Sequence, residues 1–201
     1  MAKIITIAHQ KGGVGKSTLA INLALCFQDQ LSVALVDTDL QGSLYHIRED
    51  FPALTIIGAE KLNDIKKLTY DLIIVDTPPY LSSKLPELFL HSDFILVPTK
   101  AGFFDVMAIR STISLIEEAI NKAPDTRAGI VLNMVKHRSG ITNDVRALLE
   151  QMQLPLLKTI VHDRVSVARS SMTSGVLQSG DHKAKDEITS LAEEIVELIS
   201  V

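Results

Sequence analysis

The chain has 201 residues, of which 46% are hydrophobic and 22% charged, with a net charge of −4. No low-complexity tract or Pro/Gly/Ser-rich linker divides it, so we expect one compact domain over residues 1–201. Cys26 is the only cysteine, which excludes disulfides within the chain and metal or cluster sites of the CxxC type. The first residues already have the pattern of a strand, and no apolar stretch approaches the ~18 residues of a membrane span, so a cytoplasmic protein is expected.

Short β-branched runs alternate with longer helical patterns along the chain. This alternation predicts an α/β fold with a doubly wound, mostly parallel sheet flanked by helices. The predicted strands are 4–8, 32–37, 54–57, 72–76, 94–97, 129–133 and 157–160. Apolar residues at helical spacing occur around 19–27, 109–120 and 188–198. Residues 161–181 are rich in Ser and Gly and poor in apolar side chains, and we expect them to form a mobile surface segment outside the core.

A phosphate-binding loop directly follows the first predicted strand. Residues 10–18 read Gln-Lys-Gly-Gly-Val-Gly-Lys-Ser-Thr. The glycines let successive N–H groups point at phosphate oxygens, and the helix that begins at Lys16 adds the positive end of its dipole. Lys16 then neutralises β/γ-phosphate charge and Ser17 reaches Mg²⁺. The expected nucleotide-binding residues are Gly12, Gly13, Val14, Gly15, Lys16, Ser17, Thr18.

The start of this loop departs from the common pattern. Gln10 stands where a glycine is usual, and a second lysine, Lys11, follows it. A lysine at this place need not reach its own nucleotide and can project toward the γ-phosphate of a facing subunit. The alternative is a solvated lysine in an ordinary phosphate loop.

Carboxylates follow the second and fourth predicted strands. Asp37 and Asp39 lie two residues apart, so their side chains point to the same side. One can act on the water shell of a metal while the other orients an attacking water; the alternative is a turn whose aspartates accept backbone N–H groups. Asp76 ends the apolar run 72–75 and is followed by Thr-Pro-Pro, the arrangement expected of a Walker B carboxylate that holds Mg²⁺. Ser17, Asp37 and Asp76 are therefore the expected metal-site residues.

Asn133, at the end of the sixth predicted strand, is the candidate for reading the nucleotide base. Its amide can both donate to and accept from a purine edge, although an asparagine here can equally form a turn. An Asn/Thr-Lys-x-Asp motif for guanine is absent, because residues 133–136 read Asn-Met-Val-Lys.

In chain order, the loop at 10–18, the Asp-Thr-Asp-Leu-Gln-Gly segment at 37–42, the Asp-Thr-Pro-Pro segment at 76–79 and Val-Pro-Thr at 97–99 resemble the ParA/MinD family of deviant Walker A ATPases. The similarity is greatest to its short ParA-type partition ATPases. It implies ATP and Mg²⁺ as cofactors, a homodimer in which Lys11 completes a nucleotide sandwich, and an Asp39 that positions the attacking water beside Lys16. It also favours adenine as the partner of Asn133. Leu40 replaces the proline usual in this family.

The resemblance implies an ATPase that binds nonspecific DNA as an ATP-bound dimer and releases it on hydrolysis, in plasmid or chromosome partition. No arginine finger is evident in the chain, so a slow basal rate is expected, with a centromere-binding adaptor protein that accelerates it and a nucleoid-associated location. Two alternatives stay open. One is a cargo-positioning or division-site ATPase of the same family, and the other is an ATP-dependent ligase of the dethiobiotin synthetase kind.

The C-terminal third of the chain indicates whether the ATP-bound dimer binds a membrane or DNA. MinD-like proteins end in a basic amphipathic helix, whereas the predicted last helix here carries four acids that anionic lipid would repel, so no membrane anchor is expected. These acids are Glu187, Glu193, Glu194 and Glu197. Nonspecific DNA binding needs only a local basic patch, although scattered surface charges are often just solvated. The candidate DNA contacts are Lys136, His137, Arg138, Arg164, Arg169, Lys183 and Lys185.

Overall fold

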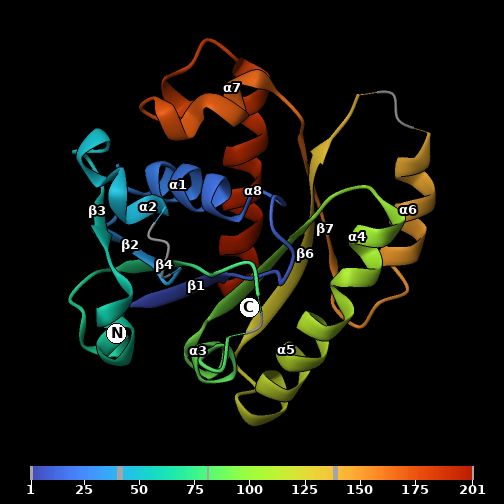
Figure 1. The fold of residues 1–201 in the computed structure, drawn as a ribbon, viewed down its shortest axis with the longest axis horizontal. Coiled ribbons are helices and arrows are strands. Elements are labelled where there is room, and N and C mark those ends of the chain that lie inside the picture. The colour runs from blue at the N-terminus through green and yellow to red at the C-terminus, as the bar shows by residue number, and fades with distance from the viewer. Residues whose placement is uncertain (1, 40–42, 81, 138–139, 201) are drawn as a thin grey trace.

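The computed structural model describes residues 2–39, 43–80, 82–137 and 140–200. Within these residues seven strands form one sheet in the order β3-β2-β4-β1-β5-β6-β7, and every neighbouring pair is parallel (Figure 1). The strands are β1 (Lys3–Ile7), β2 (Val33–Asp37), β3 (Thr55–Ile57), β4 (Leu72–Asp76), β5 (Phe94–Thr99), β6 (Arg127–Val135) and β7 (Leu156–His162). The predicted doubly wound parallel sheet is confirmed, and β1 lies at its centre.

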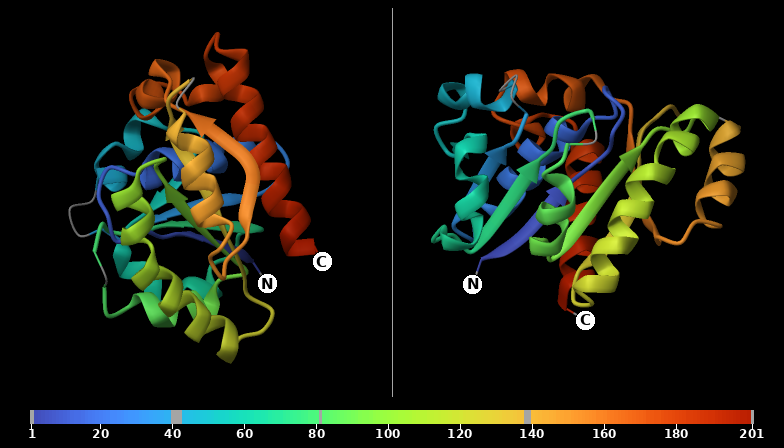
Figure 2. Two further views of the ribbon diagram at one scale, coloured as in Figure 1. Left: turned by 90° about the vertical axis from the view of Figure 1, so that its right-hand side faces the viewer. Right: turned by 60° about the horizontal axis from the view of Figure 1, so that its bottom comes forward.

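Helices cover both faces of the sheet (Figure 2). They are α1 (Lys16–Phe27), α2 (Ser43–His46), α3 (Leu85–His91), α4 (Phe103–Ala108), α5 (Arg110–Lys122), α6 (Ile141–Leu149), α7 (Val165–Arg169) and α8 (His182–Ser200), with 3-10 turns η1 (Arg48–Asp50), η2 (Ala59–Lys67), η3 (Ser170–Met172) and η4 (Val176–Gln178). One hydrophobic core joins α1 and α8 to the sheet, and a second joins α3, α4, α5 and α6 to its other face. Because both faces are covered, every residue of β2, β4 and β5 is buried, which explains their continuous apolar runs.

The expectation that residues 161–181 lie outside the core is wrong. The segment continues through α7, η3 and η4 and packs on α1 through the buried amide of Asn22. Asn22 Nδ2 donates to Ser170 Oγ at 2.7 Å, and Asn22 Oδ1 accepts the N–H of Val176 at 2.8 Å. Gly175 has a φ of 84°, and a Cβ at this position would collide with Leu25. Small and polar residues here therefore allow a close approach to α1, which the low apolar content does not reveal.

Two of the four acids on α8 face the sheet instead of solvent. β7 is an edge strand, and the Glu194 carboxylate accepts the N–H groups of Lys158 at 2.7 Å and Thr159 at 3.0 Å. Burial alone would raise the pKa of Glu194, but these hydrogen bonds outweigh it and lower the pKa. Glu187 accepts the N–H of His162 at 3.0 Å in the same way. Glu187 and Glu194 therefore do not belong to the set of acids expected to face and repel a lipid surface, because backbone N–H groups of β7 engage their carboxylates. Within the described ranges, no helix is both long and apolar enough to cross a membrane.

Replacing Glu194 by glutamine is expected to lower the free energy of unfolding by about 1–3 kcal/mol. In the wild type, both carboxylate oxygens accept backbone N–H groups. In the variant, the amide NH₂ would face one of these N–H groups and could not accept its hydrogen bond. Urea unfolding measures the change, and Glu193→Gln, on the exposed neighbouring position, is the matched control, with an expected effect within about 0.5 kcal/mol. Equal effects of the two substitutions would contradict this account of α8.

Candidate nucleotide-binding site

The phosphate loop lies between β1 and α1, at the carboxyl edge of the sheet. Gly13 and Gly15 have φ values of 70° and 88°, in the left-handed region that favours glycine. A Cβ at Gly15 would collide with Asn133 Nδ2, which donates to the carbonyl oxygen of Val14 at 2.8 Å. Asn133 thus reaches from β6 to support the loop, while Gly12 and Gly13 are exposed at its apex.

Lys16, Ser17 and Asp76 come together at the base of the loop. Ser17 Oγ donates to Asp76 Oδ2 at 2.5 Å. Asp76 is buried, and its second oxygen, Oδ1, has no hydrogen-bond partner among the described residues. Burial raises the pKa of Asp76 to about 7, with the hydrogen bond from Ser17 acting in the opposite direction. An unpartnered buried carboxylate oxygen beside a hydroxyl is a donor set that suits Mg²⁺, so Ser17 and Asp76 fit the predicted metal site.

Asp76 links the stability of the Mg²⁺-free protein to pH. Its folded-state pKa of about 7 exceeds the ~3.9 of an unfolded aspartate, so the proton stabilises the folded state fully below about pH 4 and this contribution is lost as the pH rises through about 7. We expect the free energy of unfolding of the wild type to fall relative to that of Asp76→Asn, by up to about 1.4 kcal/mol per pH unit. Chemical unfolding in chelator between about pH 5 and about pH 7 measures this difference. Parallel pH profiles would contradict the burial argument.

Asp37 and Asp76 are register partners at the ends of β2 and β4. Asp37 accepts three backbone N–H groups, from Asp39 at 3.0 Å, Leu44 at 2.9 Å and Tyr45 at 3.0 Å. These contacts match the turn alternative, and the role of Asp37 in a metal shell stays a prediction. Asp39 is partly exposed, and its charge acts on both Lys16 and Asp76, so the structure brings it to the same site. Positions Leu40 to Gly42 lie outside the described residues.

The two lysines of the loop face different surroundings. Lys16 is buried, and burial lowers the pKa of its ammonium. The Lys11 side chain is 43% exposed, and its Nζ forms an ion pair with Asp105 Oδ1 of α4 at 2.5 Å. The inner lysine is thus placed for its own nucleotide, whereas the outer one lies on the surface, held against a neighbouring helix.

Sequence reasoning missed His9 and Asp105. His9 is buried, and its Nδ1 accepts the N–H of Lys11 at 2.8 Å. Burial lowers the pKa of His9 to about 4, and the charges of Lys16 and Lys11 act in the same direction, so the imidazole is neutral at physiological pH. The signal for His9 was an ionisable residue between the first strand and the phosphate loop. Asp105 lies 94 positions from Lys11 in the sequence, and no local pattern links the two residues.

A hollow on the α1 side of β6 adjoins the phosphate loop. It is lined by Gly15, Thr18, Leu19, Asn133, Met134, His162, Asp163, Arg164, Val167 and Ala168. Met134 has a φ of 56°, the one positive value at a non-glycine residue among those described. Asn133 Oδ1 is buried without a hydrogen-bond partner in the described structure, which leaves an acceptor beside this hollow. The position agrees with a base-reading Asn133, a role that stays a prediction.

The basic candidates for DNA contact do not form a uniform group. Arg164 is largely buried, and its Nη2 pairs with Glu187 Oε1 at 2.9 Å, so its observed contact is structural. His137 is exposed and stacks on His162 with ring centroids 4.3 Å apart. Exposed Lys136, Arg169 and Lys183 and half-buried Lys185 come from three separate segments, and Arg138 lies outside the described residues.

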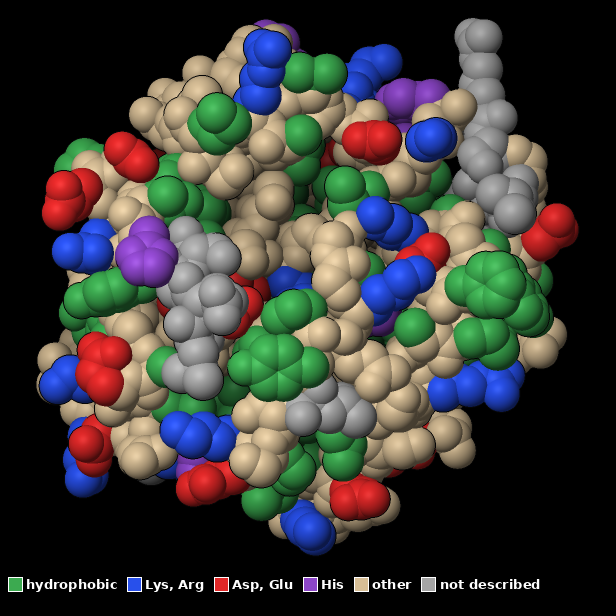
Figure 3. Space-filling view, viewed as in Figure 1, with side chains coloured by type: hydrophobic (Ala, Val, Ile, Leu, Met, Phe, Trp, Pro, Cys, Tyr) green, Lys and Arg blue, Asp and Glu red, His purple; other side chains and the backbone are tan. Residues whose placement is uncertain are grey.

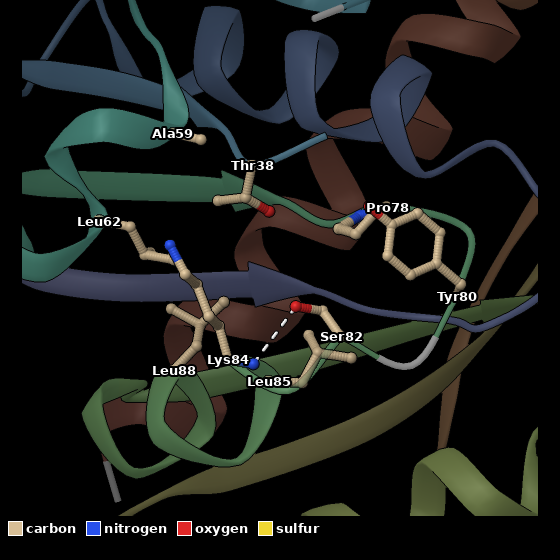
Figure 4. Close-up of a pocket in the computed structure, with 9 residues that line it drawn as sticks. All are labelled: Thr38, Ala59, Leu62, Pro78, Tyr80, Ser82, Lys84, Leu85 and Leu88. Carbon is tan, nitrogen blue, oxygen red and sulfur yellow. Dashed lines mark hydrogen bonds between the residues drawn. The ribbon is translucent and has the colours of Figure 1, made fainter. Parts of the chain in front are cut away.

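A second hollow, of about 100 Å³, lies beside the loop that follows β4 (Figure 4). Its wall includes Thr38 from the end of β2 and Pro78 and Tyr80 from that loop, with Lys84 at one side. The Thr38 hydroxyl donates to the carbonyl oxygen of Asp76 at 2.7 Å, so the ends of β2 and β4 are tied together here. This hollow is separate from the phosphate loop but shares the strand ends that carry the carboxylates.

A parallel sheet with a glycine-rich loop between β1 and α1, a buried lysine and serine, and an aspartate at the end of β4 defines a P-loop nucleotide-binding protein. The family model described as "CobQ/CobB/MinD/ParA nucleotide binding domain" matches residues 5–175, and the chain belongs to this family. The resemblance to ParA/MinD ATPases is thereby confirmed.

Two relatives illustrate the range within this family. The chain is 30% identical over 207 residues to "Maintenance of carboxysome distribution protein A" of Halothiobacillus neapolitanus, covering 96% of this chain and 95% of the relative. It is 28% identical over 198 residues to "Chromosome partitioning protein ParA" of Myxococcus xanthus, covering 72% and 69%.

Solved structures at lower identity share the fold. A plasmid partition protein from Borrelia burgdorferi bound to AMPPNP has a TM-score of 0.76 at 20% identity, with 98% of this chain and 99% of that chain covered. Apo McdA from Cyanothece has a TM-score of 0.78 at 15% identity, with 97% and 100% covered. Cobyrinic acid a,c-diamide synthase from Mycobacterium smegmatis, with ADP and magnesium, has a TM-score of 0.76 at 17% identity, with 98% and 95% covered. The same fold therefore occurs in a plasmid partition protein and in a synthase.

Proposed function

We propose that this chain is a Mg²⁺-dependent ATPase that dimerises around two ATP molecules. In that state the dimer binds DNA without sequence preference, and it releases the DNA on hydrolysis. The observation that carries the proposal is the pair of lysines in one phosphate loop. Lys16 is buried beside Ser17 and Asp76, whereas Lys11 lies on the surface, where it can reach a facing subunit.

Each site residue then has a defined task. Lys16 neutralises charge on the β/γ-phosphates, and Ser17 with Asp76 holds Mg²⁺, which supplies further charge neutralisation at the transferred phosphoryl group. Asp39 accepts a hydrogen bond from the attacking water and orients it. Lys11 leaves Asp105 and donates to the partner's γ-phosphate. Hydrolysis removes the group that Lys11 holds, so the two subunits separate.

We propose that the dimer positions a cargo along DNA, with an adaptor protein on the cargo that accelerates hydrolysis. The match to a carboxysome distribution protein over nearly the whole of both chains favours a protein assembly as cargo. Partition of a plasmid or chromosome, the expectation from the sequence motifs and the activity named for the Myxococcus relative, is the second candidate. A ligase would need a small carboxylate substrate and has no evident use for Lys11, so a change in ATP consumption with DNA or with a metabolite separates the two classes.

The proposal is tested by binding to a random DNA duplex at fixed low salt. Purified protein is compared with ADP, with ATP, and with ATP on the Asp39→Ala variant. Retention on DNA only with ATP, and for longer in the variant, is the expected result, because the variant forms the dimer without dissolving it. Equal retention with ADP and with ATP would contradict the proposal that ATP controls DNA binding.

A further inference from the structure

A buried histidine, His9, lies between β1 and the phosphate loop. It is 2% exposed, and its Nδ1 accepts the N–H of Lys11 at 2.8 Å. A backbone N–H can only donate, so Nδ1 carries no proton and the ring proton is on Nε2. Nε2 is buried and has no hydrogen-bond partner among the described residues. Within the described structure, the hydrogen bonding of this imidazole is therefore confined to the backbone of Lys11.

Packing alone does not account for a histidine at this position. A buried N–H without an acceptor is unfavourable, and an apolar side chain would fill the same space without that cost. What an apolar side chain lacks is the acceptor for the N–H of Lys11. The contact joins a side chain to the N–H two positions on, as an asparagine or aspartate does in an Asx turn. His9 thus takes the part of the turn-forming residue at the start of the loop.

The backbone of Lys11 is held on both sides. Its N–H donates to His9, and its carbonyl oxygen accepts from Lys16 Nζ at 3.4 Å. The Lys11 side chain leaves this backbone toward α4, where Nζ pairs with Asp105. Basic and acidic side chains lie side by side on this face between the loop and α4 (Figure 3). An exposed ion pair is weak, so the buried contact from His9 is the more lasting restraint on Lys11.

We infer that His9 is a positioning residue: its imidazole fixes the backbone of Lys11 and thereby the direction in which the Lys11 side chain leaves the loop. The inference rests on the proposed function, in which Lys11 acts on the nucleotide of a facing subunit. In that state Lys11 no longer pairs with Asp105, so the ion pair does not orient it. The contact from His9 lies within one chain and needs no change on assembly. Gln10 also ties this segment to α4, through Nε2 to the carbonyl oxygen of Ala108 at 2.5 Å, but the Lys11 N–H is held by His9.

The test compares two substitutions that separate hydrogen bonding from packing. His9→Leu keeps an apolar side chain of similar size and removes the acceptor, whereas His9→Asn is smaller but keeps an acceptor for the Lys11 N–H. We expect His9→Leu to lower kcat for ATP hydrolysis about tenfold, because Lys11 is misplaced, with nucleotide affinity of the monomer unchanged. His9→Asn should keep kcat within about twofold of the wild type.

The matched control is His91→Leu, at the end of α3. His91 is half-buried, and its Nδ1 is likewise buried without a hydrogen-bond partner among the described residues. It lies just before β5, at the amino edge of the sheet, whereas the phosphate loop lies at the carboxyl edge. The control should leave both kcat and nucleotide affinity unchanged.

Hydrogen exchange of the Lys11 amide tests the contact without hydrolysis. Exchange should be at least about fivefold faster in His9→Leu than in the wild type, and close to the wild-type rate in His9→Asn. The nitrogen NMR shifts of the His9 ring should identify the Nε2–H tautomer. Both readouts use the nucleotide-free protein, so neither depends on dimerisation.

The outcomes separate the inference from the proposed function. If His9→Asn lost as much activity as His9→Leu, packing would explain His9 and the inference would be overturned. A nucleotide affinity that fell in proportion to kcat would also overturn it, since His9 would then support the whole loop. A wild type that neither dimerises nor hydrolyses ATP would overturn the proposed function, while exchange at the Lys11 amide would still decide whether His9 holds this backbone.

Discussion

Replacing Asp39 by alanine is expected to slow ATP hydrolysis at least about 100-fold, because the attacking water loses the group that orients it. Binding of ATP should persist, since Lys16, Ser17 and Asp76 are untouched and Asp39 lies at the rim of their cluster. Steady-state phosphate release and nucleotide binding measure the two effects separately. A matched control is Asp125→Ala, at an exposed position between α5 and β6.

A fall in hydrolysis that merely followed weaker ATP binding would contradict the role given to Asp39. So would an effect of similar size in the Asp125 control.

Replacing Lys11 by alanine is expected to abolish ATP-dependent dimerisation and to slow hydrolysis by about 100-fold or more, by analogy with cations supplied in trans to other phosphoryl-transfer sites. Nucleotide binding by the monomer should remain, because the exposed Lys11 side chain pairs with Asp105 of α4. Lys16→Ala, in contrast, should lose nucleotide binding itself. Light scattering and a fluorescent nucleotide distinguish the two lysines.

The control for Lys11 is Lys122→Ala, an exposed lysine at the end of α5. If Lys11→Ala weakened nucleotide binding as much as Lys16→Ala does, Lys11 would serve its own nucleotide and the sandwich would not be needed. If Lys11→Ala still dimerised with ATP as the wild type does, Lys11 would be a surface lysine with no role in the dimer.

The fold could be predicted largely from the sequence because buried parallel strands leave a continuous apolar run. All seven predicted strands exist, and the ends differ by a few residues where polar side chains take part in the sheet. β6, for example, runs to Val135 although Asn133 interrupts its apolar pattern. The buried Asn133 amide is accommodated because its Nδ2 donates to the carbonyl oxygen of Val14. The phosphate loop could also be predicted, because the residues that form it are contiguous in the sequence.

Contacts between distant segments could not be predicted. The partner of Lys11 lies on α4, and the close fit of Gly175 and Ser170 on α1 looks like a polar surface loop when read as sequence. Glu194 resembles any solvent-facing acid of an amphipathic helix until the edge strand beside it is known. Each case depends on which elements are neighbours, and the local pattern carries no information about that.

The central claim is that Lys11 acts on the nucleotide of the other subunit, and mixing two inactive variants tests it most directly. Lys11→Ala and Asp39→Ala are combined at equal concentration with ATP and Mg²⁺. In a mixed dimer, the subunit that lacks Lys11 keeps its own Asp39 and receives Lys11 from its partner, so one of the two sites is complete. Hydrolysis should rise well above that of either variant alone, because each mixed dimer still carries one Lys11 and has one complete site of its two. If the mixture stays as inactive as its components, Lys11 and Asp39 must act from the same subunit, and the sandwich account is wrong.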